Sequence, residues 1–202
     1  MLAEQSFQLG EFRLSSGATS DYYIDCRATT LNAEGARLTG RVVLDEIRTR
    51  GWQPQAIGGM TLGADPIVVS VAILSSQQVQ RRASERPKTV DAAEWLIDGF
   101  LVRKEEKEHG TGRRIEGFQQ KGADVVIVDD VCTTGASTLQ ALEAARQFGF
   151  NVIGVICLVE REEGSGRAAV ERAAAPAQFV SVFKAGEIRE EHLKQRAVRA
   201  AL

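Results

Sequence analysis

The side chains that could hold a phosphorylated ligand are concentrated in residues 128–137, whose sequence is Val-Asp-Asp-Val-Cys-Thr-Thr-Gly-Ala-Ser. A loop that enters the N-terminus of a helix offers free backbone N–H groups and the positive end of the helix dipole, and both favour a phosphate. Hydroxyl side chains add donors, and a glycine lets the backbone approach the ligand closely. The run therefore predicts a phosphate site, with Thr133, Thr134 and Ser137 as hydroxyl donors and Gly135 at the point of close approach.

The adjacent carboxylates of Asp129 and Asp130 restrict the kind of ligand. They would repel a phosphate unless they accept hydrogen bonds from the ligand or face a metal ion, and sugar hydroxyls with a substrate-bound Mg²⁺ meet that need. The run matches neither the GxxxxGK[ST] loop nor the GxGxxG fingerprint, which argues against nucleoside triphosphates and dinucleotides. One Asp and one Thr alone would more simply cap a helix. The complete run favours a sugar phosphate.

Two further segments have the residue types of an anion site. The basic side chains of Arg103, Lys104, Lys107 and His109 lie in a stretch that also contains several glycines. Such a loop can close over an anion and exclude water, although neighbouring glutamates nearly balance its charge and a solvated charge run is the alternative. Arg161 follows a long apolar run, and its planar guanidinium suits a carboxylate or an imide edge. An exposed arginine at a strand end is the alternative there.

The elements that would position these residues alternate between strands and helices, which is typical of an α/β fold. The apolar runs at 125–128 and 152–159 predict central parallel strands that are buried on both faces. Apolar residues at helical spacing between them predict a helix that ends at Gly149, and hence a right-handed crossover. Ligands bind beyond the carboxyl ends of such strands, where the two aspartates follow directly.

The remaining elements are predicted with less internal support. We expect strands at 22–25, 56–57, 96–102 and 179–183, helices at 32–51 and 66–74, and a helical tail from Glu187. The polar segment 75–87 is expected to be a surface excursion, either a solvated loop or an extension of the preceding helix.

Composition excludes several classes of protein. The 202 residues are 44% apolar and 26% charged, which suits one well-buried globular core. Lys and Arg total 25 against 27 for Asp and Glu, so no general attraction to nucleic acid is expected. No apolar run approaches the roughly 20 residues of a membrane span, and the start of the sequence lacks the features of a signal peptide. Three cysteines without metal-ligand spacing predict a reducing cytoplasm.

Residues 129–137 resemble the diphosphate-sugar signature of the type I phosphoribosyltransferases. Residues 100–112 are similar to the mobile catalytic loop of the orotate phosphoribosyltransferase family, and Arg161 stands where that family places its orotate-binding arginine. Weaker similarities lie at 10–25 and 58–66, so the resemblance extends from about residue 7 to residue 183.

The resemblance implies a type I phosphoribosyltransferase fold, with a central, mostly parallel sheet flanked by helices and a small hood. It implies one domain over 1–202, with a hood from about 1–30 plus the C-terminal tail and a core from about 31–183. The implied reaction transfers the 5-phosphoribosyl group from 5-phosphoribosyl 1-diphosphate to orotate, giving orotidine 5′-monophosphate and diphosphate in UMP biosynthesis. Such a reaction needs stabilisation of an oxocarbenium-like sugar and of the charge that gathers on diphosphate.

The resemblance also implies roles for the candidate residues. The 5′-phosphate would be held by Asp130, Val131, Cys132, Thr133, Thr134, Gly135, Ala136 and Ser137. Lys107 and His109 would contact the diphosphate as catalytic residues together with Asp129 and Asp130, which would bind the ribose hydroxyls. Mg²⁺ would be held mainly by the substrate, without a direct protein ligand. Arg103 and Lys104 would lie near an active site shared across a homodimer, while Thr133 and Arg161 would contact orotate. Neither nucleic acid nor a membrane is an expected partner.

The sequence departs from the family at positions that normally contact the substrate. Ser15 replaces a lysine that many relatives have, and Thr61-Leu62 stands where some members have Tyr-Lys, so neither lysine is carried over. The family usually has one or two helices before the motif that starts here at Gly10.

Two alternatives remain open at this point. A phosphoribosyltransferase for a purine or for uracil would need the same paired aspartates, whereas Arg161 and the Lys107–His109 pattern favour orotate. A regulator that senses phosphoribosyl diphosphate and binds nucleic acid would need a basic face, which the near-neutral charge argues against.

Overall fold

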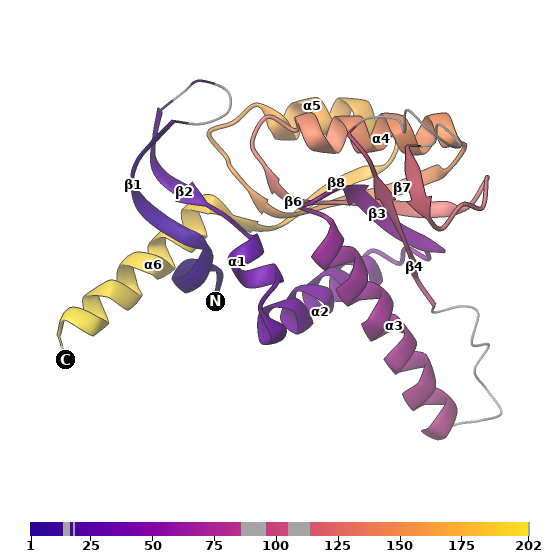
Figure 1. The fold of residues 1–202 in the computed structure, drawn as a ribbon, viewed down its shortest axis with the longest axis horizontal. Coiled ribbons are helices and arrows are strands. Elements are labelled where there is room, and N and C mark those ends of the chain that lie inside the picture. Colours follow the sequence, from indigo (N-terminus) through magenta and orange to yellow (C-terminus); the bar gives the residue numbers. More distant parts are fainter. Residues whose placement is uncertain (14–16, 18, 86–95, 105–113, 202) are drawn as a thin grey trace.

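The computed structural model describes residues 1–13, 17, 19–85, 96–104 and 114–201. Its main feature is a six-stranded sheet with the strand order β5-β4-β3-β6-β7-β8 (Figure 1). All neighbouring strands are parallel except the β4–β5 pair, so the predicted α/β class with a mostly parallel sheet is confirmed. The strands are β3 (Ala56–Met60), β4 (Asp98–Val102), β5 (Ile115–Gly117), β6 (Asp124–Cys132), β7 (Asn151–Glu160) and β8 (Gln178–Lys184).

Helices cover both faces of this sheet, as Figure 1 shows. They are α2 (Ala33–Thr49) and α3 (Asp65–Glu85) on one face, and α4 (Ala136–Phe148) and α5 (Gly166–Ala174) on the other. Another helix, α6 (Ala185–Ala200), follows β8 and lies next to the N-terminal segment instead. Alternate residues of β6 point to opposite faces: Val126 and Val128 belong to the core cluster with α2 and α3, whereas Val125 and Ile127 belong to the cluster with α4 and α5. The double burial explains why this strand is apolar without alternation.

The predicted unit β6–α4–β7 is confirmed. The helix α4 ends at Gly149, whose φ of 101° lies in the left-handed region that favours glycine. At the start of α2, the Asn32 side chain accepts hydrogen bonds from the backbone N–H groups of Glu34 and Gly35, each 3.1 Å long. These local signals correctly predicted the end of α4 and the start of α2.

A separate two-stranded sheet packs beside the main sheet near the carboxyl ends of β6 and β7, where Tyr22 meets Arg161. It consists of β1 (Phe7–Arg13) and β2 (Thr19–Ile24), preceded by the π-helical turn η1 (Leu2–Ser6) and followed by α1 (Arg27–Thr30). Phe7 stacks on Tyr22 with 5.2 Å between ring centroids and contacts His192 of α6 at 5.0 Å. The chain's two ends therefore pack together, and Tyr22 is fixed in place; the division into hood and core stays a prediction.

Several predicted boundaries are wrong. The strand predicted at 56–57 continues to Met60, because a Cβ on Gly58 would lie 2.4 Å from the backbone oxygen of Phe100 and only glycine lets the strands pack this closely. Residues 75–85 of the polar segment continue α3 as far as Glu85, which confirms the helix-extension alternative for this part. The last two residues of the segment lie outside the described residues. Among the described residues, no helix combines the length and apolar character needed to cross a bilayer.

Candidate active site

The candidate site lies at the carboxyl ends of β6 and β7. The predicted loop begins later than expected, because β6 stays paired with β7 as far as Cys132, which lies opposite Glu160. Asp129 and Asp130 are therefore held on a strand, not on a loop. Gly135 turns the chain into α4 with a φ of 77°, and a Cβ there would lie 2.7 Å from a methyl group of Val170. A glycine is required at this turn on both grounds.

The Asp129 carboxyl group is almost completely buried, with 5% of the residue exposed. It accepts hydrogen bonds from Thr138 Oγ1 at 2.5 Å and from the backbone N–H of Asp130 at 3.1 Å. Burial raises the pKa of Asp129 to about 7; the bond from Thr138 opposes this shift and the charge of Asp130 adds to it. A cation or a row of hydroxyl donors would favour the ionised form.

A cavity of about 300 Å³ lies beside these carboxylates, and we call it the aspartate cavity. Asp130 lies at its floor against Gly63, where a Cβ would come within 2.4 Å of the carboxylate. Burial raises the pKa of Asp130, while the backbone N–H of Val131, 2.9 Å from Oδ1, opposes the shift. The cavity is lined by Tyr23, Ile24, Asp25, Arg27, Met60, Thr61, Leu62, Gly63, Lys104, Asp129, Asp130, Val131 and Ser137.

A second cavity of about 540 Å³, the arginine cavity, opens beside the turn after β6. It is lined by Thr133 and Thr134, by residues 19–22 of β2, by residues 161–164 after β7 and by residues 185, 186 and 189 of α6. Arg161 is the buried cation of this cavity, because its side chain is only 4% exposed. The alternative of an exposed strand-end arginine is therefore wrong.

The guanidinium of Arg161 is held by three side chains. Its Nε and Nη2 donate to Oε1 of Glu163 at 3.0 and 2.8 Å, and Nη2 also donates to Ser20 Oγ at 2.9 Å. The group lies 4.3 Å above the ring centroid of Tyr22, whose hydroxyl donates to Glu163. Burial, followed by the bond to Glu163, raises the pKa of Tyr22 to about 12, so its hydroxyl stays protonated.

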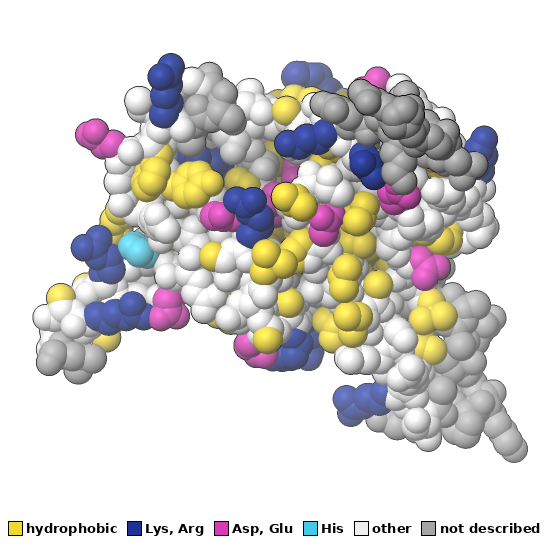
Figure 2. Space-filling view, in the orientation of Figure 1, with side chains coloured by type: hydrophobic (Ala, Val, Ile, Leu, Met, Phe, Trp, Pro, Cys, Tyr) yellow, Lys and Arg dark blue, Asp and Glu magenta, His cyan; other side chains and the backbone are white. Residues whose placement is uncertain are grey.

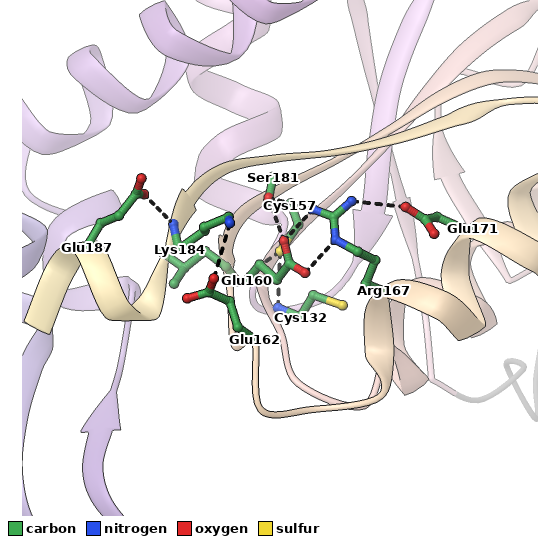
Figure 3. Close-up of polar contacts among 10 residues, drawn as sticks. Cys132, Cys157, Glu160, Glu162, Arg167, Glu171, Ser181, Lys184 and Glu187 are labelled. Atoms are coloured by element: carbon green, nitrogen blue, oxygen red, sulfur yellow. Dashed lines mark hydrogen bonds and ion pairs between the residues drawn. The ribbon is translucent and has the colours of Figure 1, made fainter.

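A second arginine–glutamate pair fixes the end of β7 from the other side (Figure 3). The buried carboxylate of Glu160 accepts from Nε and Nη2 of Arg167 at 2.6 and 2.5 Å, and from Ser181 Oγ at 2.7 Å. The hydrogen bonds from Arg167 lower the pKa of Glu160 despite its burial. Because Arg167 belongs to α5 and Ser181 to β8, this network ties three elements together behind the arginine cavity.

The structure brings most of the predicted residues to these two cavities. Asp129, Asp130, Val131, Ser137 and Lys104 line the aspartate cavity, while Thr133, Thr134 and Arg161 line the arginine cavity. Gly135 and Ala136 form the turn and the start of α4 between them.

The remaining predicted residues line neither cavity, or they lie outside the described residues. The Cys132 side chain is buried in the core, so only its backbone can face a ligand, and its N–H lies 3.1 Å from Cys157 Sγ (Figure 3). Arg103 reaches Glu116 at 3.5 Å, and neither cavity includes it. Lys107, His109 and Ser15 lie outside the described residues.

Sequence reasoning missed four residues of the site. Ser20, Tyr22 and Glu163 surround Arg161, and Arg27 lines the aspartate cavity, where it pairs with Asp25 at 2.8 Å. Tyr22 lies in a predicted strand, but nothing local indicated that it would meet a residue 139 positions away.

Comparison with known proteins gives consistent results. Residues 71–173 match the family model described as the phosphoribosyl transferase domain. Orotate phosphoribosyltransferase of Rhodopirellula baltica is 39% identical over 176 residues, which is 85% of this chain and 83% of that relative. The Aquifex aeolicus enzyme of the same name is 40% identical over 177 residues, covering 88% of this chain and 86% of the relative.

Solved structures of Mycobacterium tuberculosis orotate phosphoribosyltransferase have the same fold. The complex with Fe(III) dicitrate has a TM-score of 0.71 at 33% identity, and covers 93% of this chain and 94% of that one. The complex with 5-phospho-α-D-ribosyl 1-diphosphate has a TM-score of 0.68 at 30% identity, and covers 93% of both chains.

Proposed function

The chain belongs to the orotate phosphoribosyltransferase family, and we propose that its two cavities hold the two substrates of that reaction. The enzyme transfers a 5-phosphoribosyl group from 5-phosphoribosyl 1-diphosphate to orotate in pyrimidine biosynthesis. In our assignment the phosphoribosyl group occupies the aspartate cavity and orotate occupies the arginine cavity. The observation that supports this most directly is that the turn from β6 into α4 borders both cavities.

The 5′-phosphate is assigned to the turn at residues 130–137. The 13-residue helix α4 begins at Ala136, so its free N–H groups and positive dipole end face this turn. Asp129 and Asp130 are assigned to the ribose hydroxyls. Their negative charge stabilises the oxocarbenium-like sugar that forms when the bond from the anomeric carbon to diphosphate breaks. A ring nitrogen of orotate supplies the electron pair for the new bond and gives up its proton to the diphosphate or to water. Diphosphate leaves with the electron pair of the bond that breaks.

The diphosphate is assigned to the basic segment that follows β4. Lys104 lines the aspartate cavity, and Arg103 precedes it in the chain. Lys107 and His109 are proposed as catalytic residues on the sequence pattern alone. Positive charge there would stabilise the leaving diphosphate more in the transition state than in the bound substrate.

Magnesium fits this cavity by the chemistry of its lining. The carboxylates of Asp129 and Asp130 are hard oxygen groups, and burial raises the pKa of both, so a nearby cation would restore their ionised forms. We propose that Mg²⁺ enters with the substrate and neutralises part of the diphosphate charge.

Orotate is assigned to Arg161, and Thr133 lines the same cavity. A planar guanidinium pairs with a planar carboxylate through two parallel hydrogen bonds, and a buried one does so with little competition from water. Among the pyrimidine bases considered above, orotate has this carboxylate and uracil lacks it.

A homodimer is proposed because α3 leaves apolar side chains exposed. Val69 and Ile73 are one helical turn apart and 55% and 52% exposed, and Leu31 and Leu62 are 69% and 70% exposed. Figure 2 shows apolar side chains gathered over the start of α3 on this face. A dimer through this surface would bring the partner close to the aspartate cavity, which Leu62 lines.

The cytoplasm is the compartment that we propose. Cys26, Cys132 and Cys157 are all free and buried, as expected where thiols stay reduced.

The decisive assay follows the near-ultraviolet absorbance of orotate with and without 5-phosphoribosyl 1-diphosphate and Mg²⁺. Orotate should be consumed only when both are present, and chelation of the metal should stop the reaction. If orotate stays unchanged while uracil or a purine is converted, the assignment of the arginine cavity to orotate is wrong.

A further inference from the structure

Arg161 is a buried cation whose anionic partner is mostly outside. The Arg161 side chain is 4% exposed, whereas that of Glu163 is 54% exposed. A buried guanidinium needs an anion or several acceptors at all times, because an unpaired charge in the protein interior is strongly destabilising. A half-exposed carboxylate has no such need, because water can solvate it. Arg161 therefore always needs an anionic partner, whereas Glu163 can leave Arg161 at little cost.

Glu163 contacts one edge of the Arg161 guanidinium through only one of its two carboxylate oxygens. Nε and Nη2 of Arg161 both donate to the same oxygen, Oε1 of Glu163, at 3.0 and 2.8 Å. The hydroxyl of Tyr22 donates to that oxygen as well. An arginine edge of this kind is best matched by a carboxylate that presents two oxygens in parallel. Glu163 thus contacts this edge of the guanidinium through a single oxygen and does not form a bidentate pair.

We propose that Glu163 is a resident anion that occupies Arg161 in the free enzyme and is displaced by the carboxylate of the incoming pyrimidine substrate. This inference rests on the assignment of orotate to the arginine cavity. Glu163 and Arg161 both line that cavity, so the substrate carboxylate and the Glu163 carboxylate compete for the same edge. One anion replaces another, and Arg161 is paired before and after the exchange.

The displaced carboxylate of Glu163 can move into solvent, because its side chain is already half exposed. Glu163 belongs to the turn between β7 and α5, and rotation of its exposed side chain takes it into water without moving either element. Ser20 and the Tyr22 ring continue to hold the guanidinium from β2 during the exchange. The hydrogen bonds from Tyr22 and Arg161 lower the pKa of Glu163 against the effect of its burial, so the resident group is the carboxylate.

Competition from Glu163 should weaken the binding of orotate, and this competition should end when Glu163 loses its charge. Glu163→Gln should lower the KM for orotate by about fivefold, the range of a partly exposed ion pair, while kcat changes less than about twofold. Glu163→Ala should act in the same direction, and it excludes the case in which the glutamine amide stays on Arg161. A lowered KM is informative because damage to the turn would raise it.

Glu171→Gln is the matched control. The Glu171 side chain is 48% exposed and pairs with Arg167 at 3.0 Å (Figure 3), and it lines neither cavity, so this variant removes an equal charge without freeing Arg161. Its KM for orotate should stay within about twofold of the wild type. An equal fall in KM in both variants would reduce the effect to general electrostatics and overturn the proposal.

The variant Arg161→Ala distinguishes failure of the displacement proposal from failure of the assignment of orotate to the arginine cavity. If Arg161→Ala raises the KM strongly but the Glu163 variants leave it unchanged or raise it, Glu163 is a permanent support of Arg161 and the displacement is wrong. If Arg161→Ala leaves the KM unchanged, orotate binds elsewhere and the assignment of the cavity itself fails.

Discussion

Two arginine–glutamate pairs flank the end of β7, and they are buried in opposite senses. In one pair the arginine is inside, with Arg161 4% and Glu163 54% exposed. In the other the glutamate is inside, with Glu160 5% and Arg167 40% exposed (Figure 3). The buried member needs a partner permanently, and the exposed member does not. The sense of burial therefore tells which ion of a pair is available for exchange with a ligand.

The surroundings of the two pairs agree with this distinction. Glu160 faces Arg167 and Ser181, which belong to packed elements of the fold, so its partners are permanent. Arg161 faces a cavity of about 540 Å³, so an anion from solution can reach it. We regard the Glu160 pair as structural and the Arg161 pair as the ligand-binding one.

The largest expected effect comes from Arg161→Ala. Loss of a buried, charge-assisted pairing with orotate should raise the KM for orotate by about 100-fold or more. Thermal stability should change little by comparison, because the buried charge is removed together with its requirement for a partner. Steady-state rates at saturating 5-phosphoribosyl 1-diphosphate give the KM. Normal saturation by orotate would show that the arginine inside this pair is not the ligand-binding one.

Arg167→Ala makes the same chemical change in the structural pair and should give the opposite result. It leaves the buried Glu160 without its main partner, so we expect the free energy of unfolding to fall by about 2 kcal/mol, discounted because water can reach the half-exposed site. The KM for orotate should stay within about threefold. Urea unfolding measures the first quantity.

The control for Arg167→Ala is Glu171→Gln, which removes the exposed partner of Arg167 and leaves Glu160 paired. It should cost less than about 0.5 kcal/mol. A change in KM without a loss of stability in Arg167→Ala would erase the distinction between the two pairs.

Local sequence signals were sufficient for the centre of the fold. The strands β6 and β7 are long apolar runs, α4 has regular apolar spacing and ends at Gly149, and Asn32 marks the start of α2. The helix α5 was missed because Val170 is its one large apolar side chain. The strands β1 and β5 were missed for a related reason. β1 owes its burial at Phe7 to Tyr22 and to His192 of α6, which no short window of sequence contains.

The candidate site divides in the same way. Asp129 and Asp130 were found because they directly follow the apolar run at 125–128. The partners of Arg161 were not, because Ser20 lies 141 residues away in the chain and meets it only through the packing of β2 against the turn after β7. The two opposite senses of burial could not be read from the sequence either, since Glu160-Arg161-Glu162-Glu163 is simply a charged run.

Asp129 is a buried carboxyl group that, unlike Glu160, has no arginine partner among the described residues. Its hydrogen bonds come from Thr138 and a backbone N–H, and its pKa of about 7 lies above the ordinary 3.8. Between these values the folded protein holds a proton that the unfolded chain has released, so stability is lost as the pH rises from 4 to 7. Relative to Asp129→Asn, the wild type should lose about 2 kcal/mol over that range, because nearby dipoles relax around the charge and reduce the full effect.

Urea unfolding of both proteins at several pH values measures this difference. The raised pKa of Asp130 is common to both proteins, so it cancels in the difference between them. Parallel stability curves would show that Asp129 is already ionised in the folded enzyme at pH 4. It would then have to be grouped with the paired ions.

The smallest expected effects come from two serines that each accept a hydrogen bond from Nη2 of one arginine. Ser181 Oγ lies 3.0 Å from Arg167 and Ser20 Oγ lies 2.9 Å from Arg161. Ser181→Ala should lower the free energy of unfolding by about 1 kcal/mol and leave the KM for orotate unchanged. Ser20→Ala should instead raise that KM by about threefold, because it loosens the guanidinium that faces the ligand, with a smaller loss of stability. Measured together, the two variants test whether the direction of burial separates binding from support; the distinction fails if both serines change the same quantity.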